Sequence, residues 1–186
     1  MIFAYADPPY IGQAKKHYDK DEVDHIELMV SLDQYDGWAL SASSPSLGFL
    51  TNEAARFIPP KSLRVGIWVK PFSSFKKNVN PAYAWEPVLF RGGRKRTSAQ
   101  PTVKDWIAEN ITLKKGLSGA KPKLFCYWVF EMLGMKTEDE LIDVYPGTGA
   151  VTDAWNSWKS LKESGEDIVS LFSYKRVGAT QERGMA

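Results

Sequence analysis

"LIDVYPGTGAVTDAW", residues 141 to 155, is the stretch that first predicts the fold of this chain. An apolar run ends at Asp143, a turn with two glycines follows, and a helical pattern begins at Ala150. Glycines between a strand and a helix let the backbone approach a ligand closely, and the free N–H groups of the helix then face that ligand. The loop indicates a nucleotide-type site, although it matches neither the dinucleotide fingerprint nor the phosphate loop. A purely structural left-handed turn would explain it as well.

A second loop at the end of a strand lies near the N-terminus, in "YADPPYIG", residues 5 to 12. The apolar run at residues 2–6 leads straight into Asp7-Pro8-Pro9-Tyr10. Proline has no N–H to donate, so it ends a strand, and two in a row keep the backbone extended and rigid. Strand termination alone explains neither the acid nor the aromatic ring. The stretch therefore predicts a rigid loop that presents a carboxylate and a ring.

The remaining chain alternates between short apolar runs and helical patterns. Each strand candidate ends at Pro, Gly or Ser or at the loops described above. Strands are expected at residues 2–6, 38–42, 63–69, 87–90 and 140–144, and helices within residues 19–35, 51–58, 121–134 and 150–164. This alternation predicts an α/β sheet that is covered by helices on both faces.

Composition narrows the class of protein. With 186 residues, 44% hydrophobic and 25% charged, the chain suits one globular domain over residues 1–186. No apolar run is long enough to cross a membrane and no signal-peptide pattern opens the sequence, so a cytoplasmic location without membrane contact is expected. The single Cys126 excludes an intramolecular disulfide, and with only two histidines no metal site is expected.

Although the net charge is only +2, basic residues are concentrated in a segment at about residues 91–120. A local basic segment on a near-neutral chain indicates a surface that contacts phosphates. The candidate phosphate ligands are Arg94, Lys95, Arg96, Lys114 and Lys115, and Trp106 is the candidate for stacking on a base. A solvated, lysine-rich loop is the alternative.

Taken together, the two loops resemble the motifs of S-adenosylmethionine-dependent amino-methyltransferases, which methylate an exocyclic amine of adenine or cytosine in nucleic acid. Asp7-Pro8-Pro9-Tyr10 resembles their catalytic motif. Asp143-Val144-Tyr145-Pro146-Gly147-Thr148-Gly149 resembles their cofactor motif, with Tyr145 in place of the usual Phe. Lys121-Pro122 occupies the place of a Lys-Pro pair that precedes the cofactor strand in permuted members, and the resemblance extends to about residue 155.

This resemblance implies a Rossmann-like methyltransferase fold, a three-layer sandwich with a mostly parallel sheet. The catalytic motif comes first and the cofactor motif last, as in the permuted β-group of the family. The family sheet usually has two more strands after the cofactor loop, and an acid after the first of them binds the ribose. Here residues 167–178 allow at most one strand, with Glu163, Glu166 and Asp167 before it, so a truncated sheet is expected.

The resemblance also implies roles for individual residues. Asp7 and the carbonyl of Pro8 would hold the hydrogens of the target amine, Pro9 would stiffen the loop, and Tyr10 would stack on the flipped base. S-adenosylmethionine is the expected cofactor. The residues expected to bind it are Asp143, Tyr145, Gly147, Thr148, Gly149, Lys121 and Pro122.

The expected activity is methylation of adenine N6 in DNA, because Asp before Pro-Pro-Tyr favours adenine in such families. Methylation of cytosine N4 or of RNA stays open, and so does a catalytically degenerate fold that binds nucleic acid or a protein. The expected partner is DNA, with a homodimer or an accessory subunit left open. The small recognition segment suggests a phage or mobile-element enzyme, acting in the host cytoplasm if it is phage-encoded.

Overall fold

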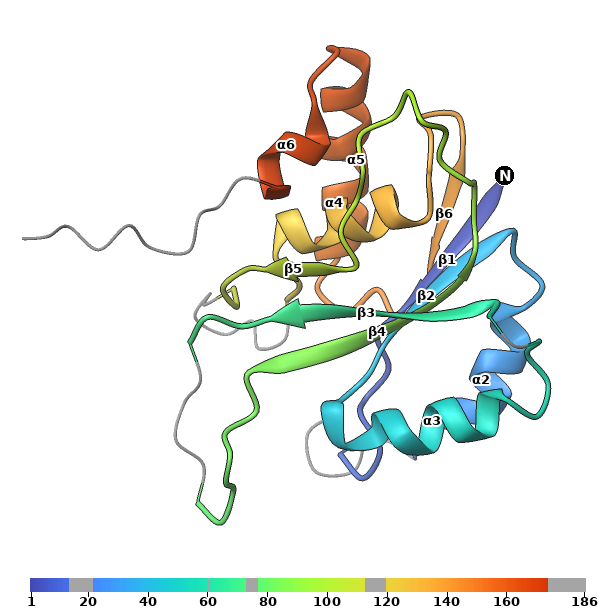
Figure 1. Ribbon diagram of the computed structural model, residues 1–186, viewed down its shortest axis with the longest axis vertical. Helices are drawn as coiled ribbons and strands as arrows, with labels where there is room; N and C mark the ends of the chain where they lie inside the picture. The colour runs from blue at the N-terminus through green and yellow to red at the C-terminus, as the bar shows by residue number, and fades with distance from the viewer. Residues whose placement is uncertain (14–21, 60, 73–76, 113–119, 174–186) are drawn as a thin grey trace, which may run out of the picture.

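The computed structural model describes residues 1–13, 22–59, 61–72, 77–112 and 120–173, in which strands alternate with helices (Figure 1). The strands are β1 (Ile2–Ala6), β2 (Gly37–Ser41), β3 (Leu63–Val69), β4 (Trp85–Gly92), β5 (Trp106–Ala108) and β6 (Glu140–Asp143). The helices are α2 (His25–Leu32), α3 (Leu47–Ala54), α4 (Lys123–Met132), α5 (Ala150–Glu163) and α6 (Ile168–Ser173), with a 3₁₀ turn η1 (Ser44–Ser46). Within these ranges, no helix has the length and apolar character needed to cross a membrane.

The strands form one sheet in the order β5-β3-β4-β2-β1-β6. β1 pairs in parallel with β2 and β6, β3 pairs in parallel with β5, and β4 is antiparallel to both of its neighbours. The sheet is therefore mostly parallel, as predicted. We call the edge at which β1, β2 and β6 end the C-terminal edge, because the loops that follow these strands leave the sheet together there.

Two apolar clusters cover the two faces of the sheet. The strict alternation of β1 places Phe3 and Tyr5 in one cluster and Ala4 and Ala6 in the other. The first cluster packs against α4, α5 and α6, and the second packs against α2 and α3 (Figure 1). Helices on both faces of a mostly parallel sheet give the predicted three-layer α/β architecture.

All five predicted strands are present; β1 and β3 have the predicted ends, and the ends of the other three differ by at most two residues. The structure adds β5, whose Trp106–Ala108 is too short to show an apolar period but pairs with β3. The second helix was predicted from residue 51, but α3 begins at Leu47, directly after the 3₁₀ turn.

The prediction of a strand within residues 167–178 is wrong for residues 167–173, the part of that range that the structure describes. Residues 168–173 form α6, in which Ile168 and Val169 are buried and Phe172 packs partly against the same cluster. These positions share one face of a helix, so the segment covers α4 and α5 rather than extending the sheet. Among the described residues, the sheet therefore ends at β6.

Candidate functional site

The two loops predicted to carry the chemistry lie side by side at the C-terminal edge. β1 and β6 are neighbouring parallel strands in which Tyr5 is paired with Asp143. The Val144 amide donates to the carbonyl of Tyr5 over 2.9 Å, so the loop after β6 stays attached to the end of β1. Asp7, two residues after Tyr5, therefore stands next to the start of the glycine loop.

Lys121 is the buried cation of this site. Its Nζ lies 3.0 Å from Oδ1 of Asp7 and 3.4 Å from Oε2 of Glu86, and only 7% of its side chain is exposed. Burial alone would lower the pKa of Lys121. The neighbouring acidic groups, of which Asp7 contributes most, outweigh burial and raise this pKa well above its ordinary value. Lys121 therefore stays protonated. The sequence motif suggested cofactor binding, whereas the observed partners of Lys121 are Asp7 in the Asp7-Pro8-Pro9-Tyr10 loop and Glu86.

Glu86 is a central residue that the sequence analysis missed. It lies near the start of β4, which runs antiparallel and so begins at the C-terminal edge. Its Oε2 accepts a hydrogen bond of 2.7 Å from the hydroxyl of Tyr10, and its Oε1 forms an ion pair with Lys70. Burial alone would raise the pKa of Glu86, but Lys121 and Lys70 outweigh burial and lower it. The available signal was an acid in the otherwise apolar run "WEPVLF".

These contacts fix the Asp7-Pro8-Pro9-Tyr10 loop in position. Lys121 joins Asp7 to Glu86, and Glu86 in turn holds Tyr10. Burial raises the pKa of Asp7 above its usual value, and Lys121 opposes this rise. The Asp7 side chain keeps 22% of its surface exposed, so its carboxylate can be reached by a ligand. The arrangement can hold a hydrogen-bond donor against Asp7 beside an aromatic ring.

The glycine loop joins β6 to α5 as predicted. Gly147 and Gly149 have φ angles of +45° and +76°, which favour glycine. Gly149 is the N-cap residue of α5 and makes no side-chain cap, so the first N–H groups of the helix face the loop. Tyr145 and Thr148 lie in the same loop, half-buried and exposed respectively.

Asp143, the last residue of β6, carries a buried carboxylate that makes no hydrogen bond of standard geometry among the described residues. Burial raises the pKa of Asp143 above its usual value, the nearby backbone N–H of Tyr145 opposes this rise, and the charge of Asp7 adds to it. A buried acceptor next to open helix N–H groups suits a ligand that carries both a cation or donor and an anionic group.

The acids considered for ribose binding lie far from this loop. α5 has 14 residues, so its last residue, Glu163, stands about 20 Å from the glycine loop. Glu166 and Asp167 follow in the turn before α6. They therefore cannot serve the site in place of the usual family acid.

The residues predicted to contact nucleic acid do not gather at the C-terminal edge. Arg94 donates to Oδ1 of Asp139 over 2.7 Å, and Asp139 directly precedes β6 at the opposite edge of the sheet. Arg96 donates to the Glu131 carbonyl over 2.8 Å and pairs with its carboxylate, at the far end of α4. The guanidinium groups of both arginines are thus engaged within the protein.

The other members of that predicted set differ in their surroundings. Lys95 is exposed. Trp106 at the start of β5 is 43% exposed, and Nζ of Lys104 lies 5.1 Å from the centroid of its ring. Lys114 and Lys115 lie outside the described residues. Lys95 and Trp106 are therefore the described members of this set whose side chains are exposed.

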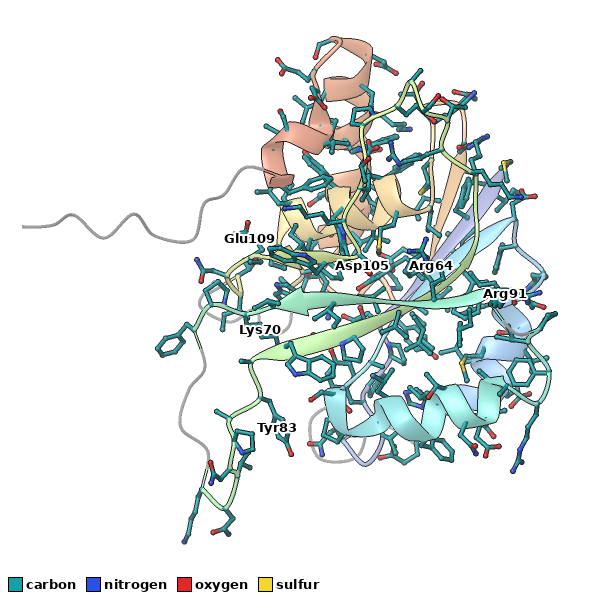
Figure 2. All side chains as sticks on the ribbon, viewed as in Figure 1. Arg64, Lys70, Tyr83, Arg91, Asp105 and Glu109 are labelled. Carbon is teal, nitrogen blue, oxygen red and sulfur yellow. The ribbon has the colours of Figure 1, made fainter. Side chains whose placement is uncertain are left out.

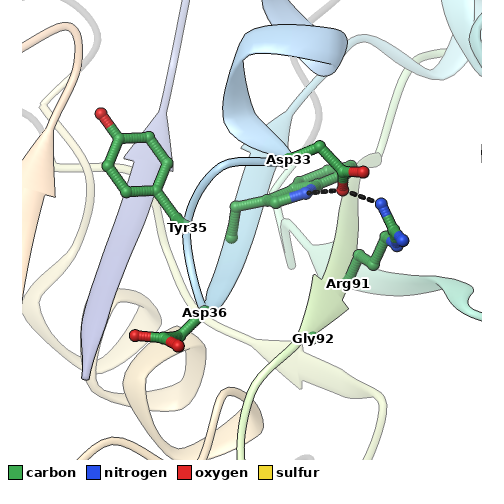
Figure 3. A pocket seen from close by; sticks show the side chains of 6 residues that line it. Asp33, Tyr35, Asp36, Arg91 and Gly92 are labelled. Atoms are coloured by element: carbon green, nitrogen blue, oxygen red, sulfur yellow. Dashed lines mark hydrogen bonds and ion pairs between the residues drawn. The ribbon is translucent and has the colours of Figure 1, made fainter.

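A polar pocket of about 160 Å³ opens at the edge opposite to Asp7 (Figure 3). Its walls come from the end of α2, the start of β2 and the end of β4. It is lined by Asp33, Tyr35, Asp36, Trp38, Arg91 and Gly92. Asp33 and Arg91 form an ion pair there. Because the pocket lies at the other edge of the sheet, it is separate from both predicted loops.

Comparison with known proteins supports the fold. No protein-family model and no curated protein sequence matches the chain. A crystal structure of the M1.HpyAVI complex with SAM matches with a TM-score of 0.55 at 14% identity, covering 84% of this chain and 77% of that one. M1.HpyAVI alone matches with a TM-score of 0.54 at 10% identity, covering 86% and 76%.

A third similar structure is the PvuII DNA methyltransferase, which is specific for cytosine N4. It matches with a TM-score of 0.50 at 11% identity, and the match covers 86% of each chain. At these identities the likeness concerns the arrangement of the elements and not the residues of the site. The chain therefore has the Rossmann-like α/β fold of these methyltransferases.

Proposed function

We propose that this protein transfers a methyl group from S-adenosylmethionine to the exocyclic N6 amine of adenine in DNA. The observation that carries the proposal is the position of the Asp7 loop beside the glycine loop, at the ends of two paired parallel strands. Two of the structurally similar proteins support methyl transfer to DNA in general, since one was crystallised with SAM and another is a DNA methyltransferase.

The residues of the glycine loop fit the cofactor. S-adenosylmethionine has a positive sulfonium, an ammonium group and a carboxylate. The buried carboxylate of Asp143 suits the ammonium group, and the free N–H groups at the start of α5 suit the carboxylate. When bound, the cofactor would supply a methyl group on a sulfonium sulfur. The amine nitrogen would attack the methyl carbon, and the sulfur would leave as a neutral thioether.

Asp7 and its neighbours would prepare the amine for that attack. The amine of adenine is a poor nucleophile because its lone pair is delocalised into the ring. Asp7 and the carbonyl of Pro8 would accept its two N–H bonds and so direct the lone pair out of the ring plane. The nitrogen must lose one proton as the new bond forms, and Asp7, with its raised pKa, is placed to receive it.

The base is tested by identifying the methylated product. We expect N6-methyladenine in the nucleosides of DNA incubated with the protein and isotope-labelled cofactor, measured by mass spectrometry. N4-methylcytosine would transfer the proposal to the alternative base, which is the specificity of the PvuII enzyme. If the isotope label appears in RNA but not in DNA when both are offered, the substrate is RNA.

A binding module without catalysis is the second candidate, because the described sheet ends at β6 and Glu163 is remote from the loop. Titration calorimetry with S-adenosylmethionine separates the two candidates. Micromolar binding supports the enzyme. The absence of binding by a folded protein would favour the binding module.

A substitution at Gly149 tests the cofactor site. A Cβ at Gly149 would meet no protein atom within 4 Å, so Gly149→Ala pays only the strain of a positive φ, about 1–2 kcal/mol. Gly165→Ala is a matched control, because Gly165 has a φ of +82° and equally open space at the end of α5. We expect both variants to lose similar stability on thermal unfolding, and Gly149→Ala alone to lose affinity for S-adenosylmethionine. Equal affinities in both variants would show that the loop is only a turn.

A further inference from the structure

The connection between β3 and β4 leaves the sheet beside the catalytic loop. β3 ends at Val69 and β4 begins at Trp85, and these two residues are paired. Lys70 directly follows β3 and forms an ion pair with Glu86, the second residue of β4. Glu86 also accepts the hydrogen bond from the hydroxyl of Tyr10. The described residues that lead into β4 extend away from the sheet, and Tyr83 lies on them (Figure 2).

This connection exposes aromatic side chains. Phe72 is 69% exposed, more than any other large hydrophobic side chain of the described residues, and Tyr83 is 49% exposed. Phe49, in the first turn of α3 after β2, is 53% exposed at the same edge of the sheet. Exposed rings beside a site that would take up a base offer stacking surfaces for neighbouring bases.

The charge of the connection suits a polyanion. Its described residues, 70–72 and 77–84, include no acid, and Lys77 is exposed. Lys70 is paired with Glu86, so Lys77 is the cation that these residues present to a ligand. An exposed cation beside exposed rings, with no acid among them, suits a nucleic-acid strand, and a hydrophobic protein partner would not select for the lysine.

We propose that Phe72, Lys77 and Tyr83, in the described parts of the β3–β4 connection, form the surface that binds DNA next to the reacting base. The inference rests on the proposed function and places DNA contact outside the basic segment at residues 91–96. That segment holds Arg94 and Arg96 in ion pairs with Asp139 and Glu131 away from the C-terminal edge. Phe72 stacks on bases, and Lys77 neutralises a phosphate.

The test is binding of a fluorescein-labelled DNA of mixed sequence, as duplex and as single strand, by anisotropy at several salt concentrations. Phe72→Ala is expected to weaken binding about tenfold, and more for the single strand than for the duplex. Lys77→Ala should flatten the slope of log affinity against log salt by about one unit. Both variants should bind S-adenosylmethionine as the parent does.

Two matched controls come from the other end of the molecule. Val30 on α2 is 52% exposed and Lys136 before β6 is largely exposed, so Val30→Ala and Lys136→Ala should leave DNA binding unchanged. If the parent methylates DNA but Phe72→Ala and Lys77→Ala bind DNA like the parent, the surface is wrong and the proposed function stands. If the parent binds neither DNA nor S-adenosylmethionine, both proposals fail. If Phe72→Ala instead converts a dimer into a monomer in light scattering, the surface belongs to a second copy.

Discussion

Replacing Asp7 with Asn should lower the rate of methyl transfer by on the order of a hundredfold or more, because a preorganised acceptor of the amine hydrogens is lost. Asn keeps the shape of the side chain but brings an N–H₂ group where an acceptor is needed. Affinity for S-adenosylmethionine should stay within a few-fold of the parent, since Asp7 belongs to the other loop. Transfer of a radiolabelled methyl group to DNA, with calorimetry for the cofactor, measures both quantities.

Tyr10 supplies an internal comparison for this prediction. Its hydroxyl donates to Glu86, whereas its ring is the proposed stacking surface. Tyr10→Phe keeps the ring and should retain most of the rate, and Tyr10→Ala should lose both the rate and the affinity for DNA. Parent-like rates in Asp7→Asn and Tyr10→Ala would remove the catalytic assignment from this loop.

Lys121→Met should destabilise the protein by on the order of 3 kcal/mol at neutral pH, because it leaves the buried carboxylates of Asp7 and Glu86 without their shared cation. Without Lys121 the pKa values of both groups rise. A carboxyl whose pKa is higher in the folded than in the unfolded protein makes folding less favourable as the pH rises above about 4. The difference from the parent should therefore be largest near neutral pH and shrink toward pH 4.

Urea unfolding at several pH values measures this effect. Lys123→Met is the matched control, because Lys123 begins the same helix but is exposed and donates a hydrogen bond of 3.2 Å to the hydroxyl of Ser157. It should be close to neutral at every pH. The expected Lys121→Met protein should also transfer methyl groups more slowly than the parent, because Asp7 loses its fixed position. A Lys121→Met protein as stable as the parent at neutral pH would show that the ion pairs of Lys121 do not hold the loop.

Local patterns in the sequence were enough to predict five of the six described strands and the two loops. The prolines after Ala6 predicted where the first strand ends, and the glycines after Asp143 predicted the turn between β6 and α5. These features depend on neighbours within a few residues, so a single sequence carries them.

Only the tertiary structure decided which charges meet. Lys121 and Glu86 are remote in sequence from the catalytic loop, and their contacts follow from the antiparallel course of β4 and the packing of α4. Likewise, Arg94 and Arg96 look like free basic residues in the sequence but face Asp139 and Glu131 in the fold. An ion pair depends on where two distant segments come together, and charge pattern along the chain has no information about that distance. The packing of α6 has the same cause, since the gain from covering α4 and α5 exceeds any local preference for a strand.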